Sequence, residues 1–203
     1  MVERAQRQTA LEPLHLPGRA VADPGGAAVV MGERRLVGKI NLRADPANGA
    51  AMAAVRSEIG FDLPTAPNTA ASAGGICALW LGPDEWLVTT LGREDATLLA
   101  RLSGGLAGYH AAAVDVGDAR TVIALRGARA RDVLAKGCGL DLHPRVFEPG
   151  RCAQTGLARA GVLIHQTGAE PAYDIYVDRS FAEYLWTWLE DAAAEFGFAI
   201  VEP

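Results

Sequence analysis

Two pairs of carboxylates come closest to a pattern that acid–base catalysis could use. Asp84 and Glu85 are neighbours, and Asp115 and Asp118 stand three positions apart. Paired carboxylates can act as acid and base when their surroundings hold their pKa values apart. Asp84 falls in a predicted tight turn, where aspartate is favoured for local hydrogen bonds. Asp115 and Asp118 flank Gly117 at a predicted strand connection. We therefore interpret both pairs as structural and assign no catalytic residue.

The histidines and cysteines do not have the spacing of a metal site. A zinc site needs three or four ligands with close pairs in the sequence, and no two histidines share a helical turn. Cys138 and Cys152 lie far apart with His143 between them, so we expect no metal, although a folded site from these three stays open. His165 falls in a predicted strand and is interpreted as a packed or surface residue. Cys77 brings the cysteines to three, too few for a disulfide framework, and we expect buried or idle thiols.

Motifs for nucleotides and for an activated serine are absent from the sequence. Neither GxGxxG nor GxSxG occurs. Residues 32–39 resemble a phosphate-binding loop, but five residues separate the glycines instead of four, and Ile40 stands where Ser or Thr would meet magnesium. Lys39 also falls inside a predicted strand rather than at the start of a helix. We therefore assign no cofactor-binding residue.

The predicted elements of the first half alternate between strands and helices. Apolar residues alternate in residues 36–43, and Met52, Val55 and Ile59 have helical spacing before Gly60. The first half is then predicted as strand 36–43, helix to 60, loop 63–75, two strands joined by a Pro-Asp turn in 78–88, a helix around 98–102 and strand 112–116.

The second half repeats this order loosely. Its predicted elements are strand 121–125, a helix from 130 closed by Gly137, a hairpin of 152–159 and 162–166, strand 173–178, a helix from 181 closed by Gly197, and strand 198–201. Ser180 and Glu183 have capping-box spacing, which predicts that Ser180 caps the last helix. The pattern favours an α+β fold of two ferredoxin-like halves with antiparallel sheets, about 35–117 and 118–203. Residues 1–34 lack periodicity and are predicted to be an extended N-terminal arm or a disordered tail.

Composition excludes several classes of protein. Half of the 203 residues are hydrophobic, which is ample for a core, and the net charge of -5 gives no reason to bind nucleic acid. The basic stretch 126–136 is interleaved with apolar residues and is interpreted as the wet face of a helix. No signal-peptide core and no apolar run of about 18 residues occurs. We expect a cytoplasmic protein that does not enter membranes.

The tryptophans are the candidates for contact with other chains. Trp186 lies off the apolar stripe of the last helix, beside Ala182 and Ala193, and needs a second surface to cover it. That surface can belong to this chain or to another, and we predict a partner interface at these three residues. Trp80 and Trp86 flank the hairpin turn and are interpreted as core, with an interface as the alternative. The predicted stripe consists of Phe181, Tyr184, Leu185, Trp188, Leu189 and Ala192.

Five segments in this order resemble the gamma subunit of heterotetrameric sarcosine oxidase. They include the runs LWLGPDEWL (79–87), ARDVLAKGC (130–138) and LDLHPRVF (140–147). The family pattern often has proline at two positions where this sequence has Ala128 and Gly139. These two departures affect no catalytic group. The matching segments are residues 74–87, 114–138, 140–155, 173–177 and 180–186.

The resemblance implies a subunit without an active site of its own. The complex of this family oxidises sarcosine with oxygen to glycine and hydrogen peroxide, and passes the one-carbon unit to tetrahydrofolate. FAD, FMN, NAD, zinc and tetrahydrofolate are expected in the alpha, beta and delta subunits, which would be the partners. The implied fold is that of the folate-binding aminomethyltransferases.

Two other functions compete with this one. A free-standing folate-binding one-carbon transferase would need a buried carboxylate beside a pterin-sized pocket, and we assign no carboxylate of the sequence to that place. The other rival is a plain interaction module in a different amine-oxidising complex.

Overall fold

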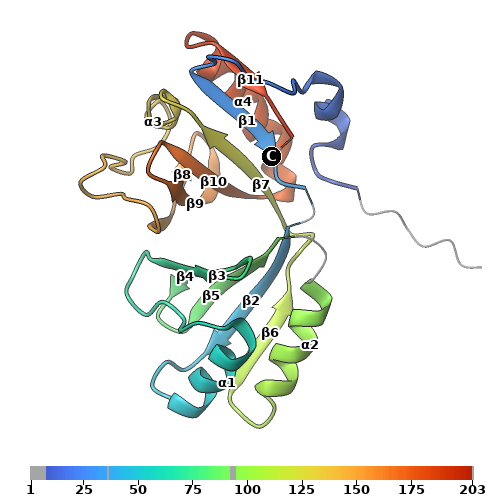
Figure 1. Cartoon of the computed structure of the whole chain (residues 1–203), viewed down its shortest axis with the longest axis vertical. Coiled ribbons are helices and arrows are strands. Elements are labelled where there is room, and N and C mark those ends of the chain that lie inside the picture. Colours follow the sequence, from blue (N-terminus) through green and yellow to red (C-terminus); the bar gives the residue numbers. More distant parts are fainter. Residues whose placement is uncertain (1–7, 36, 92–94, 203) are drawn as a thin grey trace, which may run out of the picture.

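The computed structural model describes residues 8–35, 37–91 and 95–202, and it contains two β-sheets with helices on their outer faces (Figure 1). We call them the lower sheet, with strand order β3-β4-β5-β2-β6, and the upper sheet, with order β11-β1-β7-β10-β9-β8. Every neighbouring pair is antiparallel except β1 with β11. The predicted α+β fold with antiparallel sheets is confirmed.

The lower sheet uses one continuous stretch of chain. Without β3, its order β4-β5-β2-β6 is that of a ferredoxin-like sheet, in which each helix crosses between strands that are not neighbours. Strand β3 lies inside the stretch predicted as a loop. The elements are β2 (Gly38–Ala44), α1 (Gly49–Ile59), β3 (Ala70–Ala73), β4 (Ile76–Gly82), β5 (Glu85–Thr90), α2 (Asp95–Gly105) and β6 (Ala111–Asp115).

The upper sheet adds a strand from the start of the chain to the second half. Strand β1 (Val29–Glu33) lies between β7 and β11, antiparallel to the first and parallel to the second. The remaining elements are β7 (Arg120–Arg126), α3 (Ala130–Ala135), β8 (Cys152–Leu157), β9 (Ala160–Gly168), β10 (Ala172–Asp178), α4 (Ala182–Ala194) and β11 (Phe198–Ile200).

The predicted N-terminal arm is therefore corrected over much of its length. Val29 and Met31 in β1 are fully buried, and Leu11 and Leu16 insert into the same core from the short 3-10 turns η1 (Glu12–Leu14) and η2 (Leu16–Arg19). Periodicity missed β1 because its residues are buried on both faces and do not alternate, although a continuous apolar run such as residues 27–31 is consistent with a buried strand. Residues 1–7 of the predicted arm, and Leu36 in the predicted first strand, lie outside the described residues.

A glycine fixes the entry of β1 into the sheet. Gly127 has φ +113°, and a Cβ atom there would lie 2.5 Å from the carbonyl oxygen of Ala28. The next turn begins beside it, where Arg129 N donates to Ala28 O at 3.0 Å. Only glycine allows this close approach of two backbones.

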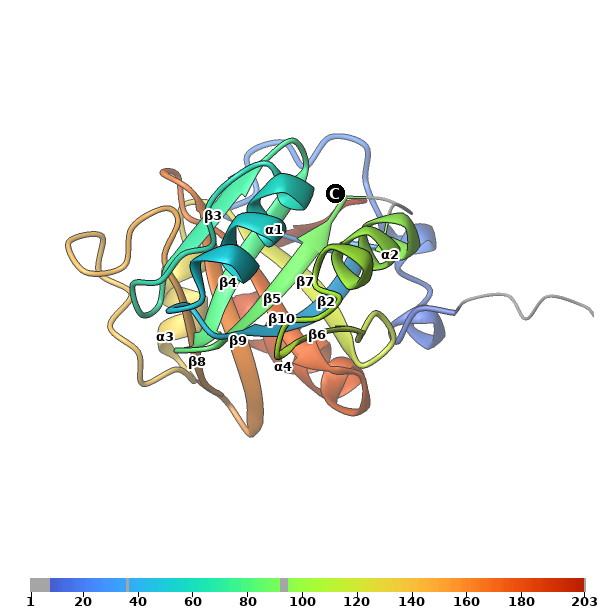
Figure 2. The same cartoon turned by 90° about the horizontal axis from the view of Figure 1, so that it is seen from below.

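The core has three parts because each strand alternates between two faces. In the lower sheet Ile40, Trp86 and Val88 face α1 and α2, which lie in front of that sheet when it is seen from below (Figure 2). In the upper sheet Met31 and Ile175 face α3 and α4. The remaining faces of the two sheets meet in a smaller cluster: Leu79, Leu87, Val122, Cys152, Leu163 and Tyr176.

Candidate functional site

A row of three residues that could do chemistry crosses the upper sheet on the face that looks toward the lower sheet. The strand register pairs Cys152 of β8 with His165 of β9, and His165 with Asp174 of β10. Residues directly opposite each other on neighbouring strands share a face, with their Cβ atoms about 5 Å apart. Cysteine, histidine and aspartate are the residue types of a nucleophilic triad, so this row is the first candidate for an active site.

The thiol of Cys152 is not activated. Cys152 is fully buried, and its Sγ donates to the carbonyl oxygens of Thr69 at 3.3 Å and Trp80 at 3.7 Å. Burial raises the pKa of Cys152 to about 11, so the side chain is a thiol rather than a thiolate at neutral pH. A reactive cysteine requires the opposite shift.

The other two residues of the row are not arranged to activate it. Burial, and then the charge of Arg34, lower the pKa of His165 to about 4, so its ring is neutral. Asp174 is engaged by Arg34, whose Nε donates to its carboxylate at 2.6 Å. Burial raises the pKa of Asp174, and Arg34 opposes that shift. The row therefore has the residues of a triad without the ionisation or the hydrogen bonds of one.

A cleft of about 410 Å³ opens beside the row, at the edge where the two sheets diverge. Burial raises the pKa of Cys77 to about 12 and the pKa of Tyr176 well above its usual value, so both stay protonated. The cleft can hold a small molecule by hydrogen bonds. Cys77 and Tyr176 stay protonated and His165 stays neutral at neutral pH, so none of these three is an activated nucleophile. The polar lining of the cleft includes Arg34, Cys77, Thr89, His165, Asp174 and Tyr176.

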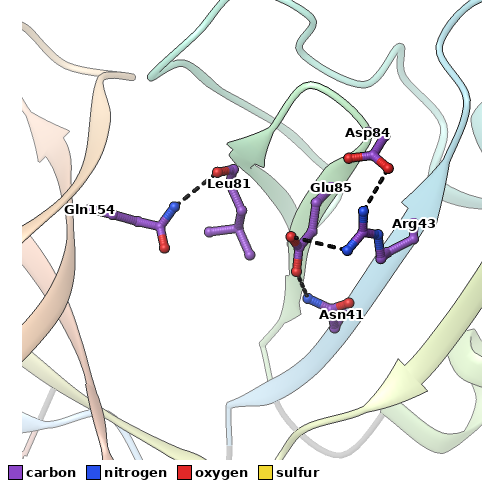
Figure 3. Close-up of polar contacts among 6 residues, drawn as sticks. All are labelled: Asn41, Arg43, Leu81, Asp84, Glu85 and Gln154. Atoms are coloured by element: carbon purple, nitrogen blue, oxygen red, sulfur yellow. Dashed lines mark hydrogen bonds and ion pairs between the residues drawn. The ribbon is translucent and has the colours of Figure 1, made fainter.

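The predicted carboxylate pair at the β4–β5 turn is a structural cluster (Figure 3). Arg43 donates to Asp84 at 2.6 Å and lies 3.7 Å from one carboxylate oxygen of Glu85. The other carboxylate oxygen of Glu85 accepts from Asn41 at 2.7 Å. Beside it, the amide of Gln154 reaches from the upper sheet to Leu81 O at 2.8 Å. In the second pair, Asp115 accepts from the backbone of Gly117 at 2.7 Å. These contacts account for Asp84, Glu85 and Asp115 without catalysis.

The three residues left open as a metal site are not brought together. Cys152 lies between the sheets, whereas Cys138 packs against the core on the helix side of the upper sheet. His143 is exposed, and its Nδ1 accepts from Arg145 N at 3.2 Å. Among the described residues no group of three potential ligands converges.

The predicted interface at Trp186, Ala182 and Ala193 is corrected. All three have an exposed fraction of 0 % and belong to the core of the upper half. Trp186 Nε1 donates to the carboxylate of Glu190 at 2.7 Å. The surface that covers this tryptophan therefore belongs to its own chain.

The apolar stripe of α4 is rotated from its predicted position. Phe181 and Tyr184, predicted to face the core, are 43 % and 40 % exposed and form an edge-to-face pair with ring centroids 6.5 Å apart. The stripe assigned from the sequence mixed two faces, because the last helix is apolar over most of its circumference. Its buried residues are Ala182, Leu185, Trp186, Leu189, Ala192 and Ala193.

Ser180 does not cap the last helix, contrary to the prediction. It lies inside the 3-10 turn η3 (Arg179–Phe181), and α4 begins after Phe181 without a side-chain cap. The hairpin tryptophans do follow the core interpretation. Trp86 is fully buried and donates to Pro64 O at 2.7 Å, and Trp80 packs partly buried against the same core.

Asp174 is the residue of the row that sequence reasoning passed over, whereas His165 was interpreted as a packed or surface residue and is half-buried. The alternation in 173–178 already separates Asp174 and Tyr176 from the apolar face, which marks a polar residue on the second face of a central strand. Which residue of a neighbouring strand lies beside Asp174 depends on the strand register, which the two segments determine only together with the sheet and its turns.

Comparison with known proteins gives consistent matches along the chain. The family model described as "Sarcosine oxidase, gamma subunit family" matches residues 43–195. The sarcosine oxidase subunit gamma of Corynebacterium sp. (strain U-96) is 38% identical over 178 residues, which cover 87% of this chain and 85% of the relative.

Two solved structures extend the comparison to the fold. A chain of the heterotetrameric sarcosine oxidase from Corynebacterium sp. U-96, in complex with pyrrole 2-carboxylate, superposes with TM-score 0.83 at 35% identity, covering 94% of this chain and 96% of that one. The glycine cleavage aminomethyltransferase T from Bartonella henselae superposes with TM-score 0.72 at 14% identity, covering 97% of this chain and 60% of that one. The second likeness shows that the fold is of the aminomethyltransferase kind, as predicted.

Proposed function

This chain belongs to the sarcosine oxidase gamma subunit family, and from that premise we propose that it is a structural subunit that assembles with the alpha, beta and delta subunits of a sarcosine oxidase. The observation that carries the proposal is the likeness, in sequence and in structure and over nearly the full length of both chains, to a chain of a heterotetrameric sarcosine oxidase. Likeness over 94% of this chain supports the same place in such a complex.

The proposed complex oxidises sarcosine with oxygen, forms glycine and hydrogen peroxide, and delivers the one-carbon unit to tetrahydrofolate. We place FAD, FMN, NAD, zinc and tetrahydrofolate in the partner subunits and the complex in the cytoplasm. The row of Cys152, His165 and Asp174 between the sheets is consistent with a structural role, because Cys152 is a thiol and His165 has a neutral ring. Oxidation of sarcosine needs a hydride acceptor such as a flavin, and the protein supplies its position. Among the described residues, no helix is long and apolar enough to span a bilayer.

Co-expression with and without this chain tests the proposal. Purified alone, the chain should be colourless and should release no hydrogen peroxide from sarcosine. Expressed with the three partners, it should co-purify in equal stoichiometry, and its omission should lower the yield and thermal stability of the flavin-bearing subunits, because an apolar contact surface would face water. Turnover by the isolated chain, or full activity of the other three subunits without it, contradicts the proposal.

A second function is favoured by one observation, the buried carboxylate of Asp174 beside a cleft of about 410 Å³. A folate-binding transferase-like protein would need such a group to bind the N–H donors of a pterin. The ion pair with Arg34 already occupies this carboxylate, so we rank the function second. Calorimetric titration of the isolated chain with tetrahydrofolate separates the two: the structural proposal expects no saturable heat, whereas the alternative expects binding that Asp174→Asn abolishes.

A further inference from the structure

Strand β6 forms the outer edge of the lower sheet (Figure 1). It consists of small residues, and its two faces differ. Ala111 and Ala113 pack against the helix-side core, whereas Ala112 and Val114 point to the other face and are exposed, Val114 at 54 %. The strand carries no proline or lysine and no bulge interrupts its pairing with β2.

The hydrogen bonds around β2 show which backbone groups of β6 point outward. Val116 N donates to Lys39 O at 2.9 Å, and on the opposite side of β2 the amide of Ala44 donates to Asp84 O at 3.1 Å. Since successive residues of a strand direct their N–H and C=O groups to opposite sides, the amides of Ala112 and Val114 are bound to β2. The N–H and C=O groups of Ala113 and Asp115 face away from the sheet.

Each of the other three edge strands forms at least one backbone hydrogen bond with another segment of this chain. Beyond β11, Val21 N donates to Ile200 O at 2.9 Å. At β8, Cys152 N donates to Asn68 O at 3.0 Å, and the far end forms a bridge through Leu157.

The start of β3 is covered as well, because Ala70 N donates to Gly150 O at 2.8 Å. Within residues 8–35, 37–91 and 95–202, no backbone group bonds to the outward side of Ala113 or Asp115. Strand β3 is open beyond Ala70, but β6 has the longer open stretch, at Ala113 and Asp115.

An exposed strand edge is a template for another strand, and proteins that must stay separate guard such edges with short strands, charges, proline or a bulge. The edge of β6 is short and ends in the charged Asp115, but it carries no lysine, proline or bulge. We propose that β6 is the docking edge for an extended segment of a partner subunit, which adds a sixth strand to the lower sheet. The inference rests on the assembly role proposed above and specifies one of its contacts. Main-chain bonds to Ala113 and Asp115 would hold the segment, and apolar side chains of the segment would cover Val114.

A second copy of this chain fits the edge less well than a partner subunit does. The edge is five residues long, about 17 Å of strand. Self-pairing over that length covers far less than the roughly 800 Å² per partner of a stable interface. A partner subunit can add this strand to a larger contact made elsewhere. Because like charges opposite each other are unfavourable, the segment should carry no acidic residue across from Asp115.

Hydrogen–deuterium exchange with residue resolution tests the proposal on the free chain and on the purified four-subunit complex. In the free chain, the amides of Ala112 and Val114 should already exchange slowly and those of Ala113 and Asp115 rapidly. In the complex, Ala113 and Asp115 should slow by about tenfold or more, as expected for amides that gain a stable backbone hydrogen bond.

Matched lysine variants provide a second test. Val114→Lys places a charge on the proposed docking edge, whereas Val146→Lys makes the same change at a site of equal exposure, 53 %, in the upper half. Val114→Lys should weaken assembly by about tenfold and Val146→Lys by less than about twofold, with melting temperatures of both free chains unchanged.

Different results identify which proposal fails. A complete complex in which Ala113 and Asp115 still exchange rapidly overturns the docking edge and leaves the assembly role intact. Protection of these amides in a dimeric free chain also overturns it, in favour of self-pairing. Absence of any complex with the partner subunits contradicts the assembly role itself.

Discussion

The two halves of this molecule are built on the same plan but are completed differently. The lower sheet closes with strands from one stretch of chain, residues 38–115, and β6 takes the place beside β2. In the upper sheet the corresponding place beside β7 is taken by β1, from the other end of the chain, and β11 is displaced to the edge. The lower sheet is therefore completed by strands from one continuous stretch of chain. The upper sheet is completed by a contact between β1 and β7, which lie about a hundred positions apart.

Removal of β1 should have the largest effect. A chain shortened to residues 34–203 lacks the buried side chains of Val29, Val30 and Met31, each worth about 2 kcal/mol, which together approach the total stability of a typical domain. We expect lost exchange protection in β7 and β11, with β2 and β5 protected longer. Simultaneous loss in both sheets would show that the halves unfold as one unit.

Each half holds one fully buried tryptophan, Trp86 below and Trp186 above. Replacement of either by alanine should lower the free energy of unfolding by about 3–5 kcal/mol in chemical denaturation. The exposed Tyr184 serves as control, and Tyr184→Ala should cost well under about 1 kcal/mol. A Trp186→Ala chain of normal stability that fails to assemble would restore the interface interpretation.

The upper half should be the more sensitive to acid through His165. Its folded pKa of about 4 lies below the usual 6.5, so the unfolded chain binds a proton that the folded chain does not. The stabilisation is complete above pH 6.5 and is lost as the pH falls toward 4, by about 1–3 kcal/mol. His165→Gln should flatten the dependence of unfolding free energy on pH in this window.

The exposed His110 provides the matched control for this measurement. His110→Gln makes the same change on the surface of the lower half and should leave the slope as in the unaltered chain. Equal slopes in the unaltered chain and in His165→Gln would mean that the pKa of His165 is the same in the folded and unfolded chains.

The smallest expected difference lies at the helix starts. Asn48 Oδ1 accepts from Ala51 N at 3.1 Å and caps α1 of the lower half, so Asn48→Ala should cost about 1 kcal/mol. Ser180 makes no cap to α4, and Ser180→Ala should stay within about 0.5 kcal/mol. Thermal denaturation of both variants measures this difference in stability. A larger loss in Ser180→Ala than in Asn48→Ala would contradict the prediction.

The sequence by itself determined the local elements and the family resemblance. Periodicity located α1 and its end at Gly60, where φ is +86°, the strands on both sides of the Pro-Asp turn, and β10. Each of these depends on neighbours within a few positions, and side-chain spacing records such contacts directly. The long segments in family order likewise predicted the gamma subunit family and the aminomethyltransferase-like fold.

Only the tertiary structure decided how these elements meet. The place of β1, the burial of Trp186 and the row of Cys152, His165 and Asp174 each depend on which strand lies beside which and in what register. The hydrophobic pattern of a strand limits its register, but backbone hydrogen bonds are alike at every position and do not specify the neighbouring strand. Burial against distant residues selects the pairing, and the same burial keeps Cys152 a thiol and His165 neutral.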